Sequence, residues 1–178
     1  LVYVEGPSDR DGLAALLRTV IEAGRQNGVG ISFHPQHSKD ALLDDVPRKA
    51  ADHLAQRPGD WVMAMPDLYP MSRYAGTRNA HASFADLDRL LRDRFDSRAT
   101  KLALPDDVRR RFRVHCLKHD LEALLLAAPD QLRQRLGTND ALKKAWRKPV
   151  EDQNDDHPPK RIVDELFKKY RKKPGYQD

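Results

Sequence analysis

Acidic side chains follow two apolar segments of the chain at the points where predicted strands end. Glu5 comes directly after the apolar run 1–4, and Asp67 follows the second apolar run, 61–65. A buried strand that ends in a carboxylate places charge at the rim of a sheet, where open α/β sheets bind their ligands. Carboxylate oxygens suit hard cations such as Mg²⁺, so these acids suggest a metal site, with Asp9 close by. The competing interpretation is that they are helix caps or solvated loop residues.

A third acidic group follows the apolar run 112–117. His119 is followed by Asp120 and, two residues later, by Glu122. If a helix starts at Asp120, both acids lie in its first turn, beside backbone N–H groups that lack helical partners. His119 can serve as a general acid/base or as a metal ligand. The structural alternative is an N-cap at Asp120 and a first-turn acid, Glu122, that the helix dipole favours.

Cations occupy an unfavourable position further along the chain. Lys160 and Arg161 follow two prolines and fall in the first turn of a predicted helix, where the dipole disfavours positive charge. Such a pair can bind phosphate together with the helix N-terminus. The alternative is an ion pair with the acidic loop 151–156. Arg73, in the long irregular segment 66–82, is a further candidate for a phosphate contact, because loops of this length are usually functional or mobile.

The overall charge is concentrated in the second half of the chain. Residues 1–100 have a net charge of −1 and residues 101–178 a net charge of +6, with an overall pI of about 9.4. A polyanion-binding surface needs such a basic half, but a solvated helix face has the same composition. The basic run 168–173 is open to the same two interpretations.

The apolar periodicity predicts the elements that must position these residues. Strands are expected at 1–4, 31–33, 61–65 and 112–117, and helices at 9–26, 39–56, from 83, at 120–128 and at 160–172. This alternation predicts a mostly parallel, Rossmann-like α/β sheet flanked by helices, with a helical basic C-terminal part. We expect a core at 1–128 and a helical extension, 129–178, packed on it as a single domain.

Composition excludes several classes of protein. No stretch approaches the roughly 20 apolar residues that span a membrane, so no membrane association is expected. The single Cys116 excludes an internal disulfide and a cysteine-based zinc site, fits a reducing cytoplasm, and is better explained as a core residue than as a nucleophile. The chain contains no Gly-x-x-x-x-Gly-Lys loop, so it is not itself a P-loop ATPase.

Several short motifs, in order, resemble known proteins. The segment 4–9, Val-Glu-Gly-Pro-Ser-Asp, resembles the opening of Toprim domains, particularly those of OLD-like nucleases. The motifs Asp67-Leu68-Tyr69, His119-Asp120-Leu121-Glu122, Pro158-Pro159-Lys160-Arg161-Ile162 and the closing Pro-Gly-Tyr-Gln of 174–177 resemble a narrower group. This group is the Toprim-like bacterial family catalogued as domain of unknown function four-two-seven-six, and the similarity covers nearly the whole chain.

The resemblance implies a Toprim-type site for Mg²⁺ or Mn²⁺ that cuts or joins phosphodiesters. It would make Glu5 the acid/base or a ligand, Asp67 a metal ligand, Asp9 a second ligand and Glu122 the acid specific to the narrower family. Members of this family lie beside ATPase genes in anti-phage defence loci, which implies an ATPase partner and leaves an oligomer formed through that partner open. The sequence departs from these patterns in two places: Tyr69 stands where the second Asp of the Toprim Asp-x-Asp belongs, and Asp120 replaces the usual first Glu of the narrower family's signature.

We therefore expect a cytoplasmic, Mg²⁺-dependent nuclease that acts on DNA or RNA in anti-phage defence. In it the acids and His119 would carry the chemistry, and Lys160, Arg161 and Arg73 would contact phosphate. Because of Tyr69, one alternative is a degenerate Toprim domain that binds nucleic acid or a phage product and regulates the ATPase without catalysis. A second alternative is a phosphotransfer enzyme acting on a nucleotide.

Overall fold

The computed structural model describes the chain except for residues 118–120, 139–140, 143–145, 151–152, 154–156 and 171–178. The described residues form two compact units, Leu1–Leu117 and Lys118–Asp178. The sequence placed the end of the core eleven residues later, after residue 128. His119 and Asp120, the run 171–173 and most of the acidic loop 151–156 lie outside the described residues.

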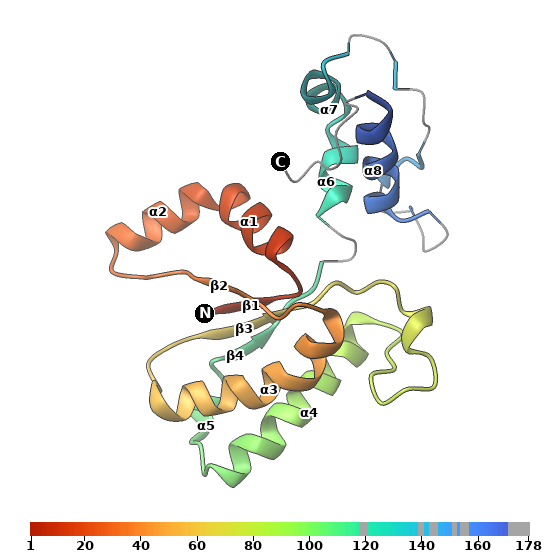
Figure 1. Cartoon of the computed structure of the whole chain (residues 1–178). Coiled ribbons are helices and arrows are strands. Elements are labelled where there is room, and N and C mark those ends of the chain that lie inside the picture. Colours follow the sequence, from red (N-terminus) through yellow and green to blue (C-terminus); the bar gives the residue numbers. More distant parts are fainter. Residues whose placement is uncertain (118–120, 139–140, 143–145, 151–152, 154–156, 171–178) are drawn as a thin grey trace. The chain divides into compact units, whose positions relative to one another are not determined.

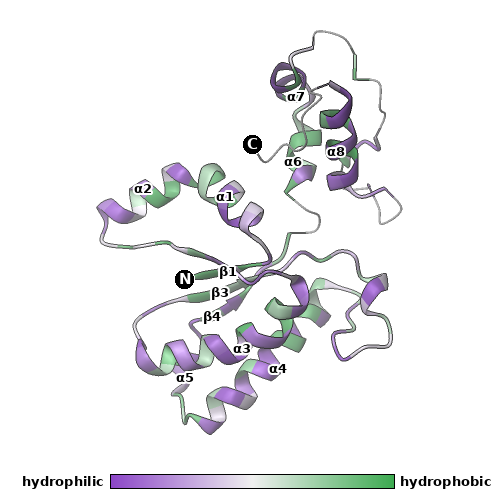
Figure 2. Ribbon diagram, in the orientation of Figure 1, coloured by the Kyte–Doolittle hydropathy of each residue, from purple (hydrophilic) through white to green (hydrophobic). Residues whose placement is uncertain are grey.

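The first unit is built on a four-stranded parallel sheet (Figure 1). Its strands are β1 (Val2–Val4), β2 (Phe33–Pro35), β3 (Val62–Met65) and β4 (Phe112–Val114), in the spatial order β2-β1-β3-β4. Every neighbouring pair is parallel. The α/β, Rossmann-like prediction is therefore confirmed, although β2 begins two residues later than the sequence pattern indicates. The central strands β1 and β3 are mainly hydrophobic, as Figure 2 shows, because both lie inside the sheet.

Helices cover the two faces of this sheet unequally. On one side, α1 (Pro7–Leu16) packs on β1 and β2, and α2 (Arg18–Gln26) follows it (Figure 1). On the other side lie α3 (Lys39–Gln56), α4 (Phe84–Lys101) and the short α5 (Asp106–Arg109). A 3₁₀ turn, η1 (Ser72–Tyr74), interrupts the long segment between β3 and α4.

The main core lies between the sheet and the pair α3 and α4. Ser38 and Ser83 cap these two helices, since their hydroxyl oxygens accept hydrogen bonds from the Ala41 and Asp86 N–H groups, both at 3.1 Å. The helix predicted from residue 83 is confirmed, with Ser83 as its N-cap. The helices and strands bury a continuous apolar cluster that includes Tyr3, Leu42, Leu43, Val46, Leu54, Val62, Leu87, Leu91, Phe95 and Phe112.

The first predicted helix, 9–26, is wrong in its start, its continuity and its buried face. It begins at Pro7, whose fixed φ suits the first helical position, and is interrupted at Leu17 (φ −96°, ψ 13°). The apolar periodicity of this segment predicts a buried stripe made of Leu13, Leu16, Leu17, Val20 and Ile21. Of these only Leu13 is buried, and Leu16 and Val20 are 60% and 56% exposed. The sheet has four strands, and within this unit α2 packs mainly against α1, so none of its side chains is fully buried there.

The second unit is helical in its described part. It contains α6 (Glu122–Ala127), α7 (Pro129–Leu136) and α8 (Pro159–Tyr170). Gly137, at φ 69°, ends α7 in the left-handed conformation that glycine adopts without strain. Trp146 and Leu142 pack against the core of this unit. The core itself consists of Leu126, Leu132, Leu136, Val150, Ile162, Val163, Leu166 and Phe167. Among the described residues, no helix has the length and apolar character to cross a membrane.

Candidate functional site

The carboxyl edge of the sheet has a switch point between β1 and β3. From β1 the chain crosses to β2 by way of α1 on one face, and it returns from β2 to β3 by way of α3 on the opposite face. Adjacent strands whose connections leave in opposite directions form a crevice at their carboxyl ends, which is where open α/β sheets bind ligands. Glu5 follows β1 and Asp67 follows β3, so both predicted acids flank this point.

A direct hydrogen bond joins the two strand ends. The Glu5 carboxylate accepts through Oε1 from the backbone N–H of Asp67, at 2.8 Å. Leu68 N–H donates to the Leu117 carbonyl at 2.8 Å, which extends the β3–β4 pairing to Asp67. The side chain of Glu5 and the backbone of Asp67 are therefore fixed relative to each other, as the sequence predicted for residues at one rim.

Asp9 has a local structural task. Its carboxylate accepts through Oδ2 from the backbone N–H of Gly6, at 2.8 Å, at the start of α1. A carboxylate at this position satisfies a backbone donor that the helix leaves without a partner. The capping interaction at the start of α1 therefore forms between Gly6 and Asp9.

Lys39 is a member of this site that the sequence analysis missed. Its side chain is only 5% exposed, and its ammonium donates to the carbonyl oxygens of Leu68 and Tyr69 at 3.0 and 3.3 Å. It also lies 5.0 Å from the centre of the Tyr74 ring, in a cation–π contact. Lys39 thus fixes the two residues that follow Asp67. The signal was present in the sequence: Lys39 is a cation in the first turn of a helix, as unfavourable there as Lys160 and Arg161.

The charged residues of this edge influence the pKa values of two side chains, Tyr74 and Cys116. Burial raises the pKa of Tyr74 to about 12; the negative charge of Asp40 adds to the rise, Arg73 opposes it, and Glu5 adds a smaller contribution. Burial also raises the pKa of the Cys116 thiol. The positive charge of Lys39 opposes this rise, and the negative charge of Asp67 adds to it. Cys116 packs against the main core, which agrees with a core residue.

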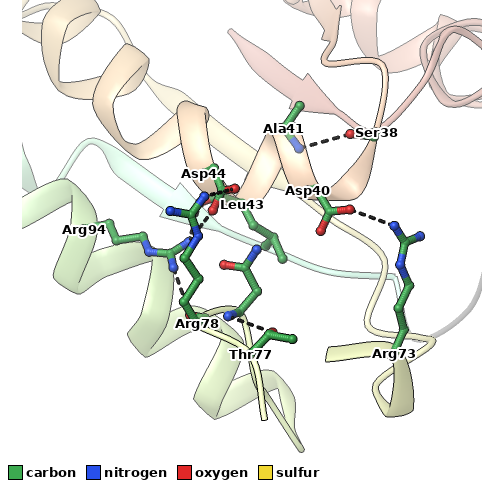
Figure 3. Close-up of polar contacts among 10 residues, drawn as sticks. Ser38, Asp40, Ala41, Leu43, Asp44, Arg73, Thr77, Arg78 and Arg94 are labelled. Carbon is green, nitrogen blue, oxygen red and sulfur yellow. Dashed lines mark hydrogen bonds and ion pairs between the residues drawn. The ribbon is translucent and has the colours of Figure 1, made fainter. Parts of the chain in front are cut away.

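The long segment after Asp67 is held on α3 and α4 by arginines (Figure 3). Arg73, a predicted phosphate contact, pairs with Asp40 at 2.7 Å and keeps 63% of its side chain exposed. Arg78 pairs with Asp44 at 2.6 Å, and Arg94 donates to the carbonyl oxygens of Leu43 and Arg78, both at 2.9 Å. The ion pair does not remove Arg73 from the surface, so the proposed phosphate contact stays a prediction.

Beneath this segment lies a buried histidine. His81 is 7% exposed; its Nδ1 lies 2.7 Å from the Asn79 carbonyl oxygen, and its Nε2 lies 3.1 Å from the carbonyl oxygen of Leu68. The Leu68 carbonyl therefore meets both Lys39 and His81, directly after Asp67. The backbone that carries Asp67 is thus held from two elements.

The remaining predicted site residues belong to the second unit. Glu122 is 8% exposed in the first turn of α6. Lys160 and Arg161 are exposed on α8, and Arg161 pairs with Glu165 of the same helix at 3.2 Å. A partner in the acidic loop is therefore not needed to explain the position of Arg161. Lys168 and Lys169 are exposed near the end of α8.

The acids of the carboxyl edge fit Mg²⁺ in their chemical type. In the described part of the chain, no group of three His, Cys, Asp or Glu side chains is arranged to hold a metal ion. Mg²⁺, however, is commonly bound by only one or two carboxylates, with water and substrate phosphates completing its coordination. Glu5 and Asp67 match that pattern, so the residues present fit a cation that binds together with a phosphate.

The chain was compared with protein families, curated proteins and solved structures. The model of the family described as "Domain of unknown function (DUF4276)" matches residues 4–177. Neither the curated proteins nor the solved structures include a significant match. The match covers almost the entire chain, including both strand ends that carry the acids. The chain therefore belongs to the family described as domain of unknown function DUF4276.

Proposed function

We propose that this protein is a Mg²⁺-dependent nuclease of the Toprim type, which hydrolyses phosphodiester bonds in nucleic acid at the carboxyl ends of β1 and β3. One observation carries the proposal: Glu5 and Asp67 flank the switch point of a parallel sheet and are joined by a 2.8 Å hydrogen bond. A helix cap explains Asp9, whereas the Glu5 carboxylate accepts a hydrogen bond from the residue that follows the neighbouring strand β3.

The residues of the edge would divide the work of hydrolysis. A divalent cation, when bound, supplies charge stabilisation at the phosphate and a water of lowered pKa. Glu5 and Asp67 would hold that cation, with Glu5 either a ligand or the acid/base. Lys39 and His81 act on the backbone after Asp67, so their part is to position that carboxylate. Arg73, Lys160 and Arg161 would contact the backbone phosphates of the polymer, which a cation pair does well.

The family resemblance also suggests where the protein acts and with which partner. It suggests an effector in the cytoplasm that acts in anti-phage defence beside an ATPase. Glu122 and His119 remain candidates for further catalytic groups on this view. The fixed geometry of Glu5 and Asp67 supports a site that is assembled before the substrate arrives.

A second candidate function is regulation without catalysis. Tyr69 occupies the position of the second Asp in the Toprim pattern, and its backbone carbonyl accepts from Lys39. A site with one fewer carboxylate can still bind nucleic acid and transmit that binding to an ATPase. The two functions differ in whether phosphodiesters are broken.

The test is a cleavage assay on labelled single-stranded and duplex DNA and RNA, and on mononucleotides. The full chain is compared in Mg²⁺, Mn²⁺ and EDTA, and with the variants Glu5→Gln and Asp67→Asn. The proposal predicts polymer cleavage that needs the metal and is lost in both variants. Metal-independent cleavage, cleavage unaffected by either variant, or binding without cleavage would contradict it, and the last result would favour the regulatory role.

A further inference from the structure

The amino half of the β3–β4 pair exposes an aromatic side chain with cations around it. Trp61, directly before β3, is 54% exposed although tryptophan is usually well buried. The guanidinium groups of Arg111 and Arg113 lie 5.7 and 5.4 Å from the centre of its indole ring. None of these three side chains is buried, so the two arginines and the indole form a surface feature rather than a core contact.

The strand register places these residues in one row. Val62 pairs with Phe112 and Met63 with Arg113, so Trp61 and Arg111 stand opposite each other one position earlier. Side chains two residues apart on a strand point to the same face. The buried members Val62 and Phe112 belong to the main core, so the intervening residues face away from it. We call this row the Trp61 row; it consists of Trp61, Met63, Met65, Arg111, Arg113 and His115.

The Trp61 row keeps its positive charge available. Arg111 donates to the Gly59 carbonyl oxygen at 2.8 Å, which orients it without neutralising it. Arg113 forms no ion pair with any of the described residues, and it and His115 are exposed. Within the first unit, α1 packs on β1 and β2, so the opposite half of this face, β3 and β4, carries the row. The row contains no acid.

We propose that the Trp61 row is a binding surface for single-stranded nucleic acid, with a base stacked on Trp61 and phosphates on Arg111 and Arg113. Sequence-tolerant binding of single strands combines an aromatic platform with cations that track the backbone. Arginine guanidinium planes also stack on bases. The Trp61 row offers both features: an indole on which a base can stack, and positive charge that can bind a polyanion.

The choice of a single strand follows from the exposed indole. Bases in a duplex are stacked on each other, and their faces cannot reach an indole on a sheet. Met63 and Met65 continue the row along β3 toward Asp67, so a strand bound at Trp61 can run toward the carboxyl edge. The inference deepens the proposed function and, in naming its substrate class, rests on it; the binding itself needs neither the metal nor Glu5.

The test measures binding of a fluorescein-labelled single-stranded oligonucleotide to the full chain in EDTA, where no cleavage occurs. Trp61→Ala should weaken binding by about tenfold, and Trp61→Phe, which keeps an aromatic face, by much less. Arg111→Ala with Arg113→Ala should lower the slope of log affinity against log salt by about 1.4, for two lost phosphate contacts. The duplex of the same sequence should bind weakly.

A matched control and a spectroscopic signal complete the test. Arg18→Ala with Arg25→Ala removes the same charge from exposed positions on α2 and should leave affinity near wild type. In a Trp146→Phe background, the emission left from Trp61 should be quenched on binding, since Trp61 is then the single tryptophan. An unquenched Trp61, wild-type binding by Trp61→Ala, equal loss in the α2 control, or equal binding of duplex would each overturn the proposal.

The experiment also separates the two proposals. Glu5→Gln should bind the single strand as wild type does. Binding that depends on the Trp61 row, without cleavage by the wild type in Mg²⁺, would reject the nuclease and keep the surface. Metal-dependent cleavage that persists while the row variants bind and cleave normally would reject the surface and keep the nuclease.

Discussion

At the scale of residues, the sheet edge depends on one carboxylate and one lysine. Glu5 satisfies the backbone N–H of Asp67, and Lys39 satisfies the carbonyl groups of the two residues after it. Both interactions cross between elements distant in the sequence. Each residue therefore has a structural role, and variants must distinguish that role from a role in catalysis.

Two substitutions at Glu5 should have different effects on stability. Glu5→Gln keeps an oxygen that can accept from the Asp67 N–H, so the free energy of unfolding should change little. Glu5→Ala leaves that partly buried N–H without its partner and should cost about 1–2 kcal/mol. Urea unfolding measures both. Cleavage should be lost in both variants, because both remove the charge. A Glu5→Gln protein that unfolds as readily as Glu5→Ala would show that the charge itself holds the fold.

Lys39→Met should loosen the segment after Asp67 and change the reactivity of Cys116. Loss of charged hydrogen bonds to two carbonyl groups in a buried position should cost about 2–3 kcal/mol. Lys39 opposes the rise in the pKa of Cys116, so its removal should raise that pKa further and slow thiol reaction with a disulfide reagent at neutral pH. The control is Lys49→Met, which removes the same charge from a more exposed site on α3. Equal effects in both variants would contradict the role given to Lys39.

The acids could be predicted from the sequence because a strand followed by a carboxylate is a local pattern. Glu5 and Asp67 come out at one edge as expected. Lys39 was missed because its role depends on the return of residues 68–69 to the start of α3, a contact made 29 and 30 residues away along the chain. The row at Trp61 was missed because it needs the β3–β4 register.

At the scale of elements, the segment between β3 and α4 is bound to the helices on one side. Arg73, Arg78 and Arg94 connect it to α3 and α4, and Tyr74 is buried beneath it at 3% exposure. The helices 39–56 and 84–101 were predictable because serine caps and apolar periodicity agree there. The buried face of the first helix could not be predicted in this way, because an amphipathic stripe is buried only where another element covers it.

Tyr74 should give the stability of the fold a specific dependence on alkaline pH. Its pKa is about 12 in the folded protein, against about 10 in an unfolded chain. A raised pKa means that the unfolded state releases the proton first. The stabilisation is therefore complete below about pH 10 and is lost as the pH rises toward 12. Denaturant unfolding across this range should show a steeper decline for the wild type than for Tyr74→Phe. Parallel curves would show that Tyr74 is not held in its protonated form.

At the scale of the whole molecule, the acids and the basic excess lie in different parts of the chain. The first unit contains Glu5 and Asp67, and the second contains Lys160 and Arg161 on α8. The division of the sheet from the helical basic part was predictable from composition.

The basic helix should contribute to nucleic-acid affinity through specific positions. Lys160→Ala with Arg161→Ala should lower the salt slope of binding by about 1 to 2, for two lost phosphate contacts. Lys168→Ala with Lys169→Ala removes the same charge from the far end of α8 and should matter less. Affinity is measured against salt concentration, with Ca²⁺ in place of Mg²⁺ if cleavage must be suppressed. An unchanged slope in the first variant would assign Arg161 to its pair with Glu165 alone.

The most direct measurement of the central claim is where a divalent cation binds. Mn²⁺ broadens the NMR signals of nearby backbone amides; Gly6 directly follows Glu5 in the chain, and the Asp67 N–H donates to the Glu5 carboxylate. With a single-stranded oligonucleotide present, substoichiometric Mn²⁺ should broaden these two amides first, and Glu5→Gln should abolish the effect. Broadening that centres elsewhere, or that persists unchanged in Glu5→Gln, would contradict a metal centre at the carboxyl ends of β1 and β3.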